Sequence, residues 1–94
     1  MAKKKVEQQS HQEEVLKQLL DLLEKLSINV RYDRGFFYGG LVRYKDQLYL
    51  YLNRKSETMQ KIEIIVDELK YIHVPEDLIS EDLKPYFQFS NQEV

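Results

Sequence analysis

Hydrophobic positions recur at helical spacing in two parts of the chain. The first stripe follows Ser10, which with Glu13 has the spacing of a capping box and predicts the start of a helix. The second stripe follows Ser56, a favourable N-cap residue, and ends at Pro75, because the residue before a proline avoids the helical region. The apolar positions are Val15, Leu16, Leu19, Leu20, Leu22, Leu23 and Leu26 in the first stripe, and Met59, Ile62, Ile65, Val66, Leu69 and Ile72 in the second. Both stripes predict amphipathic helices.

The region between the two stripes has the pattern of extended chain. Residues 28–32 are predicted to form a short extended segment, and Asp33-Arg34-Gly35 is typical of a turn. A strand is predicted over residues 36–44, interrupted by a glycine pair that indicates a bulge. Residues 48–53 return as the partner strand of a hairpin.

The register of this hairpin depends on the length of its loop. A three-residue loop, Lys45-Asp46-Gln47, would place Tyr44 opposite Leu48 and separate two kinds of side chain onto two faces. We expect a core face of Val42, Tyr44, Leu48, Leu50 and Leu52, and an opposite face of Leu41, Arg43, Tyr49 and Tyr51. The second face is aromatic and carries a cation.

The elements predict an α+β fold. Their order is α-β-β-β-α, followed by a short helical turn after Pro75, with two helices packed on one face of a small antiparallel sheet of about three strands. Ninety-four residues make one domain. We expect a flexible N-terminus over residues 1–9, the domain over 10–85 and a tail over 86–94. The tail aromatics Tyr86, Phe87 and Phe89 either pack back on the domain or lie exposed.

Composition excludes several kinds of chemistry. The chain has no cysteine, so disulfides, thiolate metal sites and a cysteine nucleophile are absent. No run of apolar residues is long enough to span a bilayer, and none follows Lys3-Lys4-Lys5 as in a secretory signal, so a cytoplasmic protein is expected. Residues 30–61 carry seven basic and three acidic residues, whereas residues 62–94 carry two basic and eight acidic ones. This asymmetry either steers an acidic partner to the hairpin or lets the two halves attract each other.

One part of the chain resembles a known family. Gly40-Leu41 begins a hairpin strand, the return strand ends at Asn53, and the following helix carries Asp67-Glu68-Leu69. This layout resembles the core of the ImmA/IrrE-type zinc metallopeptidases, in which a similar hairpin leads to a helix with a pattern like A-H-E-L-G-H. The resemblance covers about a third of the chain. It implies a truncated, metal-free relative of that family.

The residues that would bind zinc in such a peptidase are replaced here. The motif needs two histidines four positions apart on one helix face, and this chain has Asp67 and Tyr71 at those positions. Glu68 stands where the resemblance places a general base, but without a metal no activated water is present for it to act on. His11 and His73 are interpreted as surface residues. We therefore expect no metal, no cofactor and no catalytic residue.

The tyrosines carry the remaining functional signal. Tyr49 and Tyr51 with Arg43 form the predicted aromatic face, and such residues are enriched in protein interfaces. The predicted function is a non-catalytic protein-interaction module that binds a protein partner or a second copy of itself. The alternative is a nucleic-acid-binding protein that uses Arg43, Lys45, Arg54 and Lys55, and a zincin-like metallopeptidase is the third possibility. A structural role, in which the tyrosines fill a half-buried sheet face, is also open.

Overall fold

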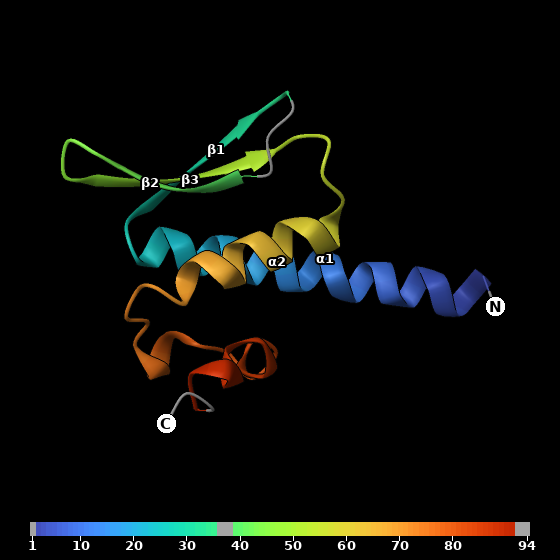
Figure 1. The fold of residues 1–94 in the computed structure, drawn as a ribbon. Coiled ribbons are helices and arrows are strands. Elements are labelled where there is room, and N and C mark those ends of the chain that lie inside the picture. The colour runs from blue at the N-terminus through green and yellow to red at the C-terminus, as the bar shows by residue number, and fades with distance from the viewer. Residues whose placement is uncertain (1, 36–38, 92–94) are drawn as a thin grey trace.

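The computed structural model describes residues 2–35 and 39–91, and its elements follow the predicted order (Figure 1). The α+β class and the succession α-β-β-β-α are confirmed. The elements are α1 (Ala2–Lys25), β1 (Ile28–Asp33), β2 (Gly39–Tyr44), β3 (Gln47–Asn53) and α2 (Thr58–Leu69), followed by the 3-10 helices η1 (Glu76–Leu78) and η2 (Lys84–Asn91). The predicted extension of the second strand to Phe36 lies outside the described residues. None of the described helices is long and apolar enough to cross a membrane.

Helix α1 begins earlier than the capping-box pattern predicted. It starts at Ala2, so Ser10 lies within the helix and not at its N-cap. The reason is local propensity: residues 2–9 contain no glycine or proline and consist largely of alanine, lysine, glutamate and glutamine, all good helix formers. Helix α1 ends at Lys25, and Ser27 follows it with a left-handed φ of 61°, a conformation that stops a helix.

Helix α2 is displaced and shortened relative to the prediction. Its N-cap is Glu57 and not Ser56, and the Gln60 side chain accepts a hydrogen bond from the Glu57 backbone N–H at 3.1 Å to complete a capping box. The helix ends at Leu69, well before Pro75. The following N–H groups bond three residues back, as in Ile72 to the Leu69 carbonyl at 3.2 Å, so the chain tightens and leaves the helix. The predicted turn after Pro75 is present as η1.

The hairpin between β2 and β3 has a two-residue loop, not the predicted three-residue loop. Lys45 and Asp46 have φ values of 50° and 66°, the conformation of a type I′ turn, whose twist matches that of the flanking strands. The register therefore moves by one residue, and Tyr44 pairs with Gln47 and Val42 with Tyr49. Because a one-residue slip reverses the faces of a strand, β2 turns over relative to the prediction.

The sheet is mixed and not wholly antiparallel. The strand order is β1-β3-β2, with β2 antiparallel to β3 and β1 parallel to it. Strand β3 is central, and its Leu50 and Leu52 are buried on the side that faces the helices. The short connection from β1 to β2 is anchored by Asn53, whose side-chain amide donates to the Gly35 carbonyl at 2.8 Å. Asn53 is the last residue of β3, and it is buried, with 5% of its surface exposed.

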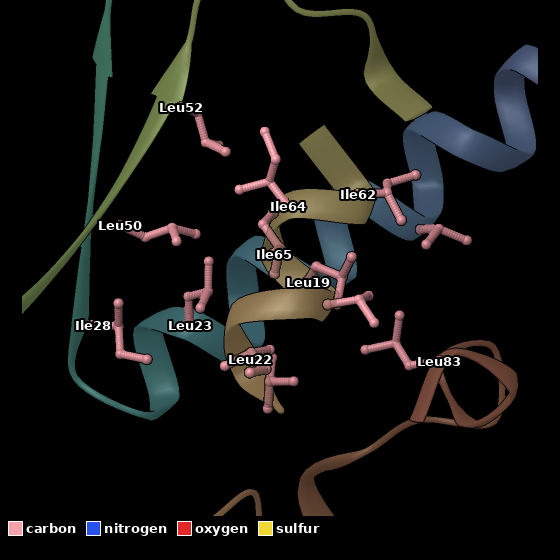
Figure 2. Close-up of a cluster of buried hydrophobic side chains, with 13 residues drawn as sticks. Leu19, Leu22, Leu23, Ile28, Leu50, Leu52, Ile62, Ile64, Ile65 and Leu83 are labelled. Atoms are coloured by element: carbon pink, nitrogen blue, oxygen red, sulfur yellow. The ribbon is translucent and has the colours of Figure 1, made fainter. Parts of the chain in front are cut away.

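Both helices pack on one face of the sheet (Figure 1). Helix α1 packs against β1 and α2, and α2 also packs against β2 and β3. Residues 76–91, here called the C-terminal segment, lie on the other side of the helices and form a third layer. Figure 2 shows the side chain of Leu83 pointing from this segment toward the helices, and Tyr86 and Phe87 also pack against the core. Of the two alternatives predicted for the tail aromatics, Tyr86 and Phe87 therefore follow the first and pack back on the domain.

Candidate functional site

The face of the sheet opposite the helices is left open by the described residues. We call it the outer face and define it by the side chains of Asn29, Arg31, Val42, Tyr44, Gln47, Tyr49 and Tyr51, which the pairing places on one side of the three strands. Two large hydrophobic side chains of this face are exposed to solvent, Val42 to 47% and Tyr44 to 59%. Tyr49 and Tyr51, on the central strand, are half-buried. A cluster of exposed apolar and aromatic side chains is typical of an interaction site.

Polar contacts hold the aromatic rings of the outer face in place. The Arg31 guanidinium lies 5.3 Å from the centre of the Tyr49 ring, within the range of a cation–π interaction. The Tyr49 hydroxyl donates to Gln47 Oε1 at 3.3 Å, and the Asn29 amide donates to the same oxygen at 3.3 Å. At the hairpin tip, Lys45 Nζ lies 5.4 Å from the centre of the Tyr44 ring. The face therefore combines tyrosines with cations.

The structure groups the predicted interaction residues only in part. Tyr49 and Tyr51 share the outer face, as expected, but Arg43 pairs with Leu48 and lies on the opposite, helix-facing side of the sheet. Arg31 of β1 takes the place predicted for Arg43. The two-residue turn could have been inferred from Lys45-Asp46, since aspartate tolerates the left-handed region. No comparable signal in the local sequence predicts the parallel pairing that brings Arg31 beside Tyr49.

The predicted nucleic-acid contacts do not form one cluster. Arg43 and Lys45 lie at the hairpin tip, whereas Arg54 and Lys55 follow the other end of β3. All four side chains are exposed. The Arg54 backbone N–H donates to the Asp33 carbonyl at 2.8 Å and continues the pairing with β1. The basic residues thus mark both ends of the sheet and not a continuous groove.

A second candidate site is the hollow beside the residues that carry the family resemblance. Gly39, Ile64, Asp67, Glu68, Lys70 and Tyr71 line a depression of about 300 Å³. Asp67 pairs with Lys70 at 3.4 Å, and Tyr71 is 82% exposed. Glu68 Oε1 accepts a hydrogen bond from the Leu41 backbone N–H at 3.3 Å. In the described part of the chain, no three histidine, aspartate or glutamate side chains are grouped as a metal site would require.

The Glu68 contact closes part of the β2 edge, and a substitution tests this role. We expect Glu68→Ala to lower the free energy of unfolding by about 1 kcal/mol, because the Leu41 N–H loses its acceptor at a half-exposed position. Glu68→Gln keeps an oxygen acceptor and should cost less. Urea denaturation measures both. Asp67→Ala, which removes only an exposed ion pair, is the control and should change stability by under about 0.5 kcal/mol. A Glu68→Ala effect no larger than that of the control would contradict this role.

Comparison of the chain with known protein families, curated proteins and solved structures finds no match. The geometry of the described residues offers two candidate functional sites, the outer face and the hollow beside Glu68.

Proposed function

We propose that this chain is a non-catalytic protein-interaction module that binds a partner protein through the outer face of its sheet. The observation that carries the proposal is the one-sided packing of the sheet. Both helices cover one face, whereas the described residues leave the opposite face open with Val42 and Tyr44 exposed beside two further tyrosines. Tyrosine gives a large contact area at a low cost in conformational entropy, which suits it to an interface.

Charge indicates the kind of protein surface that fits. Arg31 lies on the outer face, and Lys45 lies at the hairpin tip. Arg34 and Arg54 follow the C-terminal ends of β1 and β3, at the end of the sheet away from the tip. Residues 30–61 have a net charge of +4. A partner surface with carboxylates around an apolar centre would be attracted to this face and held in register by its charges. The partner in this proposal is therefore an acidic protein surface.

Two contacts favour a protein over a nucleic acid as the partner. Base stacking needs free aromatic faces, and a cation already lies against the rings of both Tyr44 and Tyr49. The basic side chains also lie at two ends of the sheet and do not follow one path for a phosphate backbone. The hollow beside Glu68 gives weaker support for a peptidase than the outer face gives for a protein interface. Its two carboxylates already have partners, since Asp67 pairs with Lys70 and Glu68 accepts from the Leu41 N–H.

Substitution of the tyrosines tests the proposal. Tagged protein is recovered from a lysate of the source cells after nuclease treatment, the associated protein is identified, and its affinity is measured with purified components. We expect Tyr49→Ser and Tyr51→Ser each to weaken the association at least tenfold, as the loss of a hot-spot tyrosine does. The control is Tyr71→Ser, which makes the same chemical change at a tyrosine that is 82% exposed outside the face and should leave affinity unchanged.

Three results would contradict the proposal. Equal loss of affinity in the Tyr71→Ser control would show that the effect is not specific to the outer face. Loss of the bound material on nuclease treatment would favour the nucleic-acid alternative, which also predicts an affinity that falls steeply with salt. A loss of about 2–5 kcal/mol in stability for Tyr49→Ser or Tyr51→Ser would show that these rings serve the core.

A further inference from the structure

The peptide groups of β1 alternate between its neighbour β3 and the free edge of the sheet. The Asp33 carbonyl accepts from the Arg54 N–H at 2.8 Å, so the backbone of Asp33 faces β3. In a parallel pair, every second residue directs its peptide groups to the neighbouring strand. Asn29 and Arg31 therefore also face β3, and Val30 and Tyr32 direct their N–H and C=O groups outward.

The two edges of this sheet differ in how well they are closed. At the β2 edge, Glu68 accepts from the outward N–H of Leu41, and the strand opens with Gly39 and Gly40, both at positive φ. Such features discourage pairing with another strand. At the β1 edge, the Val30 carbonyl has a long contact of 3.4 Å with the Arg31 guanidinium. No residue in the ranges 2–35 and 39–91 accepts a hydrogen bond from the outward N–H groups of Val30 and Tyr32.

Two partly buried leucines of α1, Leu16 and Leu20, form an apolar surface beside the β1 edge. Gln18 of α1 donates to Asp82 at 2.9 Å and therefore faces the C-terminal segment. At about 100° per residue, Leu16 and Leu20 lie about 160° around the helix from Gln18, which places them toward the sheet. Helix α1 meets the sheet at β1, and Leu16 and Leu20 are both only partly buried against the core. A strand added to β1 would set alternate side chains on these leucines.

We propose that the free edge of β1 accepts an extended segment of a partner protein as a fourth strand of the sheet. Backbone hydrogen bonds to Val30 and Tyr32 supply affinity, and the two faces of the strand supply selectivity. Side chains on the helix side meet Leu16 and Leu20 and are apolar. Side chains on the outer side lie beside Arg31, which selects a carboxylate. The segment thus alternates apolar and acidic residues. This proposal uses a surface distinct from the rings of the outer face.

A nuclear magnetic resonance titration tests the edge directly. The probe is a short, blocked synthetic peptide in which valine alternates with glutamate, added to ¹⁵N-labelled protein. We expect the amide signals of Val30 and Tyr32 to shift and their hydrogen exchange to slow at least tenfold, because these N–H groups gain acceptors. The amides of Asn29 and Arg31 already face β3 and should keep their exchange rates. Unchanged exchange at Val30 and Tyr32, or protection centred on Leu41 at the other edge, would overturn the proposal.

A matched pair of variants separates the backbone contact from the side chain. Val30→Pro removes one outward N–H at an edge position that tolerates proline, and it should weaken peptide binding at least tenfold. Val30→Ala keeps the N–H and should bind within about threefold of the original protein. Equal affinity of the two variants would overturn the proposal, and circular dichroism confirms that each is folded. Tyr49→Ser should still bind this peptide, so a failure of the outer-face proposal is distinguishable from a failure of this one.

Discussion

Replacing Leu83 with alanine is expected to lower the free energy of unfolding by about 2–5 kcal/mol. Leu83 is 1% exposed and belongs to the C-terminal segment, from which it reaches the core beneath the helices (Figure 2). The substitution removes buried methyl groups and leaves a cavity, and its neighbours can fill that cavity only in part. In a chain of this size such a loss is a large share of the total stability. Equilibrium urea denaturation, followed by circular dichroism, measures the change.

The control for this prediction is a surface position in the same segment. Asp77 of η1 is exposed, and Asp77→Ala should change the free energy of unfolding by under about 0.5 kcal/mol. An effect of Leu83→Ala no larger than that of the control would mean that the C-terminal segment does not stabilise the helices. In that case, removing residues 80–94 would also leave the midpoint of denaturation unchanged. The structure predicts that this truncation destabilises the protein at least as much as Leu83→Ala.

Replacing Gly39 with alanine is expected to cost about 3 kcal/mol or more of stability. Gly39 has a φ of 126°, a region that residues with a Cβ rarely adopt, and a strained residue of this kind costs about 1–3 kcal/mol. The added Cβ would also lie 2.6 Å from the Tyr51 carbonyl oxygen on the facing strand. That oxygen belongs to the backbone of the central strand, so relieving the overlap requires the pairing of β2 with β3 to shift. Thermal and urea denaturation measure the loss.

Gly40 provides a close comparison for Gly39. A Cβ at Gly40 would lie 3.2 Å from Glu68 Oε1, which ends a flexible side chain that can move aside. We expect Gly40→Ala to destabilise the protein less than Gly39→Ala. The reverse order, or equal costs, would show that the close approach of β2 to Tyr51 is not what requires glycine. The double variant Gly40→Ala/Glu68→Ala would then test whether the Glu68 side chain limits the space.

The helical part of the fold was predictable because its signals are local. The leucine stripe of α1 and the isoleucine stripe of α2 follow the period of a helix. The helix ends were less predictable. Residues 2–9 have no helix breaker, so α1 extends past the predicted cap at Ser10, and α2 stops at Leu69 although its apolar pattern continues to Ile72.

The candidate site was predictable only in part, because it depends on pairing between strands. Alternation along β3 placed Tyr49 and Tyr51 on one face, since successive side chains of a strand point to opposite sides. Which residues join them depends on the register of β2 and on the neighbour of β3. The two-residue turn moved Arg43 to the other face, and the parallel pairing of β1 brought Arg31 beside Tyr49.

The sequence by itself determined the class of fold, the order of its elements and the two tyrosines of the outer face. These properties follow from periodicity and composition, which act over a few neighbouring residues. The tertiary structure alone decided that β1 pairs with β3 in parallel and that Leu83 completes the core. It also decided that Glu68 closes part of the β2 edge, whereas no described residue accepts a hydrogen bond from the outward N–H groups of β1. These properties arise from contacts between residues far apart in the chain, where small differences in packing select one arrangement over another.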